Sequence, residues 1–329
     1  MIVLKIPETL NGKTFYDEIL PSIYESIING DYSIDFDMHR TELANPEGLI
    51  NFLAAASMIR NKSGYIPVLY LPESRNLLAY MGGAGFFRWA TVPDCEALRL
   101  KTFYNESYGN MHNSNHFRPQ LYGLFTHTVE DNRYVEYNRH LANVEKITLE
   151  IEDSLKNFVD ASELSRYCRR LRRSLVQILK NALEHNPGYS GTLAYYMIQK
   201  TPYDTIEFVC SDIGQGILER MKKMLRDGDA EAIKKYGHLE QNLNKRNLLF
   251  CEHANNPNLL AITHAVEYRE DSEIPGLHKI KEFALKYGGL FSIHSGNYTV
   301  AYRQGKIETK YHKDSYFSGC HLKLVVNTK

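Results

Sequence analysis

The segment from residue 160 to 185 contains a long helix with one apolar face. Its apolar side chains recur at spacings of three and four residues: Leu164, Cys168, Leu171, Leu175, Ile178 and Ala182. At 3.6 residues per turn they form a single stripe about six turns long. A helix of this kind is stable only when the stripe covers another layer, so we expect the chain to fold around a packed core.

The composition fits a globular chain. Of 329 residues, 43% are hydrophobic and 24% are charged, and 39 basic residues balance 39 acidic ones. A net charge of zero argues against a chain-wide basic surface, so a nucleic-acid partner is not expected. The length favours two domains over one.

The cysteines and the apolar runs indicate the compartment. The five cysteines are widely spaced and form no C-x-x-C pair, which argues against a disulfide framework or a structural zinc site. The first residues lack the features of a signal peptide, and no uncharged apolar run approaches a membrane span. We therefore expect a soluble, cytoplasmic protein without a membrane partner.

The first hundred residues alternate between strand and helix patterns. Strands are expected at 33–38 and 65–71, and helices at 49–59 and 73–81. This alternation predicts a parallel sheet. From 102 to 119 the chain becomes rich in Asn, His, Ser and Tyr, which predicts a linker. The expected division is therefore a domain at 1–100, a connecting segment at 101–150 and a second domain at 151–329.

The second half has sharper signals. Asp160 with Glu163 is the pattern of a capping box at the start of the long helix. A helix is also expected over 277–287, ended by two glycines. Strands are expected at 191–201, 205–212, 290–295, 298–303 and 320–326.

Four short motifs follow these elements in order. They are Leu179–His185 on the long helix, Asp212–Gly216 at a strand end, Pro275–Leu277 at a helix start, and Gly319-Cys320 before the last strand. In this order they resemble the N box, the two glycine boxes and the closing Gly-Thr element of the Bergerat-fold (GHKL) ATPases. That family includes gyrase, MutL, heat-shock chaperone, histidine-kinase and anti-sigma-factor kinase domains. The resemblance covers about residues 160–326 and implies an α/β sandwich, a mixed sheet with helices on one face.

The resemblance assigns roles that suit the chemistry of these residues. Asp212 would accept a hydrogen bond from the adenine amino group of ATP. Glycines at 214 and 216 let the backbone approach the base. Asn181 would offer an oxygen to Mg²⁺ held between protein and phosphates. Gly276 and Leu277 at a helix start would face the phosphates, and Gly319 would close the site.

Two positions depart from the family pattern. Gln177 stands where hydrolytic members carry a Glu that activates water, and a neutral amide orients water but does not take its proton. Gln177 and, in the N box itself, Glu184 are the candidate catalytic residues. Ile274 stands where the second glycine box has another Gly, and a β-branched residue resists positive φ.

The first half resembles a STAS domain, the antagonist that partners GHKL kinases. The resemblance rests on a strand, then Asn45-Pro46-Glu47-Gly48-Leu49 opening an apolar helix, then a strand and a helix. STAS domains carry Asp-Ser-Ser/Thr in that loop and are phosphorylated on the serine. Pro46 has no hydroxyl, so this switch is not available here. A generic α/β domain is the alternative.

The expected function is ATP–Mg²⁺ binding that switches contact with a regulatory protein partner, with weak or partner-dependent hydrolysis. The alternatives are an anti-sigma-type serine/threonine kinase, an active ATPase subunit of a bacterial defence or repair complex, and a scaffold that binds no nucleotide. A homodimer is an open alternative. Two clusters stay outside this scheme: His112 with His116, interpreted as a polar linker, and the arginines between Arg166 and Arg173. That arginine cluster is either a nucleic-acid or phosphate-facing patch, or else a solvated face or an ion-paired contact with the first domain.

Overall fold

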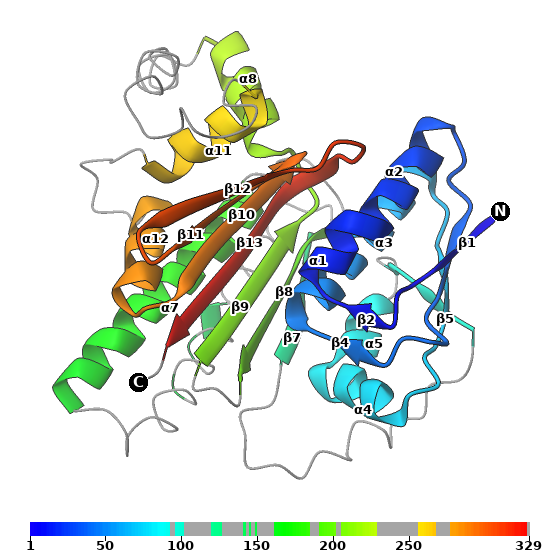
Figure 1. Cartoon of the computed structure of the whole chain (residues 1–329), viewed down its shortest axis with the longest axis horizontal. Coiled ribbons are helices and arrows are strands. Elements are labelled where there is room, and N and C mark those ends of the chain that lie inside the picture. The colour runs from blue at the N-terminus through cyan, green and yellow to red at the C-terminus, as the bar shows by residue number, and fades with distance from the viewer. Residues whose placement is uncertain are drawn as a thin grey trace.

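The computed structural model describes residues 1–92, 96–101, 120–126, 161–184, 191–201, 205–228, 256–267 and 277–327, with residues 141, 142, 145 and 149. Side chains at 179–184 lie outside the described set. The fold is of the α/β class, as expected, and contains a parallel and an antiparallel sheet (Figure 1).

The first half forms a four-stranded parallel sheet in the order β1-β3-β5-β6. Its strands are β1 (Ile2–Lys5), β3 (Ile34–Asp37), β5 (Val68–Tyr70) and β6 (Arg99–Leu100). A small parallel pair is formed by β2 (Thr9–Leu10) and β4 (Leu43–Ala44). The helices are α1 (Gly12–Thr14), the π-helix η1 (Phe15–Ile19), α2 (Leu20–Ile28), α3 (Pro46–Ser63), α4 (Arg75–Ala84) and α5 (Phe86–Ala90).

The π-helix has a local cause. Pro21 has no amide hydrogen and cannot donate to the carbonyl four residues earlier. The turn before it widens, and the Leu20 N–H reaches the carbonyl of Phe15, five residues back.

The second half forms a seven-stranded sheet in the order β12-β11-β10-β13-β9-β8-β7. These strands are β7 (Gln120–Thr126), β8 (Gly191–Lys200), β9 (Thr205–Asp212), β10 (Leu290–Gly296), β11 (Tyr298–Arg303), β12 (Lys306–Tyr311) and β13 (Phe317–Asn327). All six described pairings are antiparallel. The expectation of a mixed sheet is therefore wrong: hairpins join β8 to β9 and β10 to β11 to β12, and β13 runs antiparallel to both of its neighbours.

The helices of the second half are α7 (Ala161–Glu184), α8 (Ile217–Arg226), α11 (Pro257–Glu267) and α12 (Leu277–Lys286). One face of the seven-stranded sheet is covered by α7, α11 and α12, and the predicted apolar stripe of α7 is buried there from Leu164 to Ile178. Helix α3 of the first half covers the opposite face (Figure 1). Helices from both halves therefore enclose this sheet.

Alternate residues of the central strands enter different cores. Tyr196 and Phe208 pack with α7 and α12. Tyr195 and Val209 join the core of the first half. The core on the α3 side of the sheet therefore contains residues from both halves of the chain, while the domain limits given above stay a prediction.

Helix α3 lies between the two sheets, which explains why its sequence is apolar on every side. Every residue from Gly48 to Ile59 is buried. Asn45 caps its N-terminus through a 2.8 Å hydrogen bond from the Gly48 N–H to Oδ1, and Pro46 occupies the first turn, where its missing amide hydrogen is not needed.

Candidate functional site

The end of strand β9 places the predicted adenine-binding carboxylate on the side of the sheet covered by α7. Phe208 and Cys210 face that core, and Asp212 follows them at the next alternate position. Asp212 is 3% exposed. Its Oδ1 accepts a 3.1 Å hydrogen bond from the Gly214 N–H, and the backbone N–H of Cys320 also donates to the carboxyl group.

This environment shifts the protonation of Asp212. Burial raises the pKa of Asp212 from 3.8 to about 7, against the opposing effect of the two backbone N–H groups. The carboxyl group therefore titrates near neutral pH, and it lies at a strand end beside a glycine loop. Perturbed carboxyl groups of this kind are concentrated at functional sites.

Three chain segments close around this strand end. The Ser295 hydroxyl of β10 donates to the Gly319 carbonyl (3.0 Å) and accepts from the Ile217 N–H (3.0 Å), the first amide of α8. Gly319 has a φ of +99°, and a Cβ there would collide with the Asp212 carbonyl. Both the positive φ and the lack of space for a Cβ require glycine at position 319.

The Ser318 hydroxyl completes this closure with a 2.7 Å hydrogen bond to the Gly214 carbonyl. A Cβ at Gly216 would come within 2.8 Å of the Ser295 hydroxyl. The structure thus brings together four predicted residues, Asp212, Gly214, Gly216 and Gly319, and holds them with two serines that the motifs did not indicate.

The remaining predicted residues are placed less completely. Gln177 is half-buried on α7, and Leu277 is the first residue of α12. Both helices cover the side of the sheet that Asp212 faces. Asn181 and Glu184 belong to the last turns of α7, but their side chains lie outside the described set, and so does Gly276. The magnesium part of the site therefore stays a prediction.

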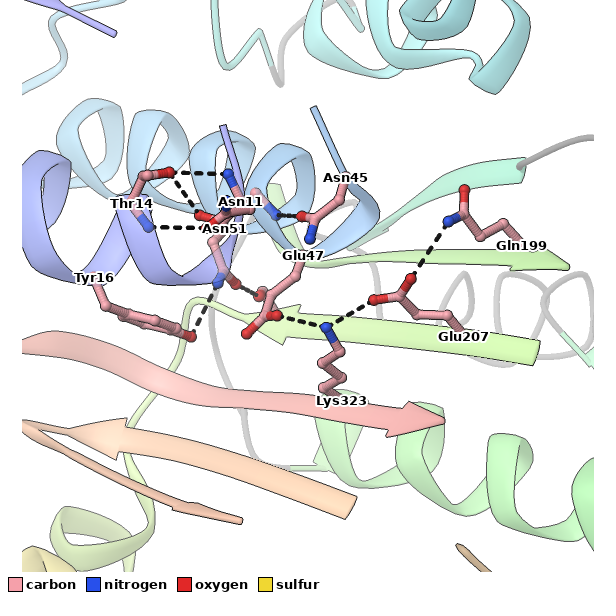
Figure 2. Close-up of polar contacts among 11 residues, drawn as sticks. Asn11, Thr14, Tyr16, Asn45, Glu47, Asn51, Gln199, Glu207 and Lys323 are labelled. Atoms are coloured by element: carbon pink, nitrogen blue, oxygen red, sulfur yellow. Dashed lines mark hydrogen bonds and ion pairs between the residues drawn. The ribbon is translucent and has the colours of Figure 1, made fainter. Parts of the chain in front are cut away.

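A chain of buried hydrogen bonds occupies the opposite face of the same strand end (Figure 2). The Ser211 hydroxyl donates to Asn51 Oδ1 of α3, and Asn51 Nδ2 donates to the Tyr16 hydroxyl of η1 at 2.9 Å. Tyr16 is 7% exposed, and the other two side chains are fully buried. Ser211 immediately precedes Asp212 in β9, and the two side chains face opposite sides of the sheet. Helix α3 therefore contacts one face of the strand end whose other face carries the candidate nucleotide-binding carboxylate.

An ionic cluster lies farther along the same interface (Figure 2). Lys323 Nζ of β13 is 2.8 Å from Glu47 Oε2 and 2.9 Å from Glu207 Oε1. Burial alone would lower the pKa of Lys323, but the two carboxylates raise it above its ordinary value. Glu47 thereby joins the first turn of α3 to the sheet. Glu207 Oε2 also accepts from Gln199 (3.3 Å), which accepts from Tyr80 of α4 (3.0 Å).

Three buried histidines extend this polar interface toward β12. His294 stacks on Tyr16 with ring centroids 4.3 Å apart, and its Nδ1 lies 2.8 Å from the Thr299 hydroxyl. His312 lies 3.0 Å from the same hydroxyl. Burial lowers the pKa of His312 to about 4 and that of His321 to about 3, so both rings are neutral at physiological pH.

The arginine cluster at 166–173 lies on the solvent-exposed side of α7. All five arginines of α7 are exposed, and Arg172 Nη1 pairs with Glu145 Oε1 at 2.9 Å. Helix α7 lies on the face of the sheet opposite to α3, and Glu145 belongs to the expected connecting segment, not to the first hundred residues. His112 and His116 lie outside the described residues.

Comparison with known proteins finds no matching family model, curated protein or solved structure. Among the described residues, no helix is both long and apolar enough to cross a membrane. The described part of the chain also contains no cluster of three or more His, Cys, Asp or Glu side chains arranged to hold a metal ion.

Proposed function

We propose that this chain is an ATP–Mg²⁺-binding regulatory protein, in which nucleotide binding changes contact with a protein partner. The observation that carries the proposal is Asp212, a buried carboxyl group at a strand end, beside a glycine loop and facing the helix that bears Asn181. An ionised carboxylate in this place accepts a hydrogen bond from the adenine amino group. The backbone around Gly214 and Gly216 passes close to the base.

The burial of Asp212 and its place beside the glycine loop support the base-binding part of the proposal, and the metal-binding part rests on Asn181 alone. Bound Mg²⁺ would neutralise phosphate charge, with Asn181 as the protein ligand offered by α7. The amide of Gln177 holds a water but does not take its proton. We therefore propose that hydrolysis is weak or depends on a partner, and that binding itself is the signal.

Calorimetric titration with a non-hydrolysable ATP analogue tests the binding. Wild type should bind, Asp212→Asn should bind much more weakly, and Glu219→Gln, which changes an exposed carboxylate on α8, should bind like wild type. GTP should bind poorly, because its base offers a carbonyl where adenine has an amino group. Equal heats for wild type and Asp212→Asn would refute the proposal.

The same titration has an expected pH dependence. Binding requires ionised Asp212, whose pKa is about 7, so affinity should fall below pH 7 by up to about tenfold per pH unit. A separate hydrolysis assay should show turnover below about 1 per second without a partner. Gln177→Glu should raise that rate, and an unchanged rate would mean that water is not activated at this position.

A further inference from the structure

We infer that the first half of the chain completes the nucleotide site, with Asn51 of α3 acting as a positioning residue for Asp212 through Ser211. The inference rests on the proposed function for its binding readout. It concerns an element from the opposite side of the sheet, in a part of the chain about 160 residues earlier.

The side chains of Ser211 and Asp212 face opposite sides of the sheet and make different contacts. Successive residues of a strand face opposite sides of the sheet. Asp212 therefore faces the helices of the second half, while the Ser211 hydroxyl is bound to Asn51. Any rotation or slide of this strand end that breaks the Asn51 contact also moves the Asp212 carboxyl group. Asn51 is itself fixed by its hydrogen bond to Tyr16.

Burial makes this constraint stiff. Ser211 and Asn51 are both 0% exposed. A hydroxyl or amide that lost its partner here would have no access to solvent, and leaving such a group unsatisfied is costly. The strand end therefore has one favoured position while α3 is docked.

The neighbouring strands extend the contact across the sheet. Ser211 lies between Tyr195 of β8 and His321 of β13 in the strand register, and His321 lies opposite His294 of β10. Tyr195 hydrogen bonds to Ser57 of α3 at 3.0 Å, and His294 stacks on Tyr16. One row of side chains, from β8 to β10, thus contacts the first half directly behind the row that contains Asp212.

Reciprocity follows from this arrangement. If docking of α3 fixes Asp212 for the nucleotide, then a bound nucleotide must favour docking of α3 by the same factor. Nucleotide bound at Asp212 would therefore strengthen the packing of the first half of the chain, through α3, against the antiparallel sheet.

Two readouts on the full-length chain test the inference in Ser211→Ala, Asn51→Leu and the double variant. The first is hydrogen exchange of the Gly214 amide, which donates to Asp212 and needs no nucleotide. The second is affinity for the ATP analogue. The matched control is Tyr80→Phe, which removes one hydroxyl from the same interface at the other end of the strands.

We expect Ser211→Ala and Asn51→Leu each to speed Gly214 exchange and to weaken nucleotide binding, both by about tenfold. The double variant should be no worse than Asn51→Leu alone, because both changes break one contact. Tyr80→Phe should stay within about twofold of wild type in both readouts. Ser211→Ala is the smaller change and is decisive should Asn51→Leu fail to fold.

The inference is overturned if Gly214 exchange is unchanged in Ser211→Ala, or if Tyr80→Phe has an equal effect. A wild-type chain that binds no nucleotide would refute the proposed function. The exchange measurement would then decide alone whether Asn51 positions Asp212.

Discussion

Replacing Asp212 by Asn should make the protein more stable while it weakens the site. Burial raises the pKa of Asp212 to about 7, whereas its ordinary value is 3.8. Between these two pH values the unfolded chain has released this proton and the folded chain still holds it. Stability therefore falls as pH rises through this window and levels off above pH 7.

The size of the effect follows from the same two numbers. At about 1.4 kcal/mol per pH unit, the interval from 3.8 to about 7 corresponds to about 4 kcal/mol, lost in full above pH 7. The asparagine side chain does not ionise, and its oxygen still accepts from the Gly214 N–H. Between pH 5 and pH 8 the wild type should lose about 3 kcal/mol relative to Asp212→Asn.

Urea denaturation at pH 5 and pH 8 measures this difference. Other groups titrate equally in the two proteins, so comparison of the variant with wild type isolates Asp212. The control is Glu219→Gln, which removes an exposed carboxylate on α8 that pairs with Lys222, and its unfolding free energy should stay within about 1 kcal/mol of wild type. If Asp212→Asn were destabilised by the same amount at both pH values, the carboxyl group would be ionised throughout, and the reasoning would fail.

Three further variants test other parts of the structure. Gly319→Ala should lower the free energy of unfolding by about 2–4 kcal/mol in denaturant titration, because its Cβ collides with the Asp212 carbonyl. Gly305→Ala is also at positive φ but in open space, and it should lower the free energy of unfolding by only about 1 kcal/mol. Lys323→Met should lower the free energy of unfolding by about 3–5 kcal/mol, because it leaves two carboxylates without their cation. Lys310→Met, at the exposed ion pair with Asp17, should lower it by less than about 1 kcal/mol. His321 has a pKa of about 3 in the folded state and 6.5 ordinarily, so acid unfolding of wild type between pH 6 and pH 4 should be steeper than that of His321→Phe by about 1.4 kcal/mol per pH unit. Equal costs for either glycine or lysine pair, or equal acid slopes, would contradict the corresponding interpretation.

Periodic local patterns predicted five strands of the antiparallel sheet, two strands of the parallel sheet, and the helices α3, α4, α7 and α12. The apolar stripe of α7, the hairpin of β8 and β9, and the alternation in the first half were all visible in the residues. Boundaries were less accurate: α3 begins at Pro46 rather than at 49, since Asn45 and Pro46 are capping residues. Strand β13 begins at Phe317 rather than at 320, because Gly319 takes positive φ inside the strand instead of ending it.

Two strands of the seven-stranded sheet had no usable pattern. Strand β12 is an edge strand with alternating charges at Lys306, Glu308 and Lys310, which protect an edge but give no apolar period. Strand β7, also an edge, lies in a stretch of mixed composition.

The candidate site was predictable only where it is local in sequence. Asp212, Gly214 and Gly216 form a short motif, whereas Ser295 reaches them from 78 residues away. Asn51 is a polar residue in the mostly apolar, buried stretch of α3, and this was the one available signal of its buried partner. The all-round apolar sequence of α3 indicates a buried helix, but no local pattern indicates which strands cover it.

The position of α3 between two sheets has a consequence for synthesis on the ribosome. The contacts of α3 with the antiparallel sheet join residues 138, 160 and 276 positions apart. A nascent chain that has completed the first sheet therefore still exposes one apolar side of α3 until β8, β9 and finally β13 emerge. Such long-range contacts form slowly, and uncovered apolar surface promotes aggregation. Unfinished chains of this protein should therefore be clients of chaperones that bind apolar segments.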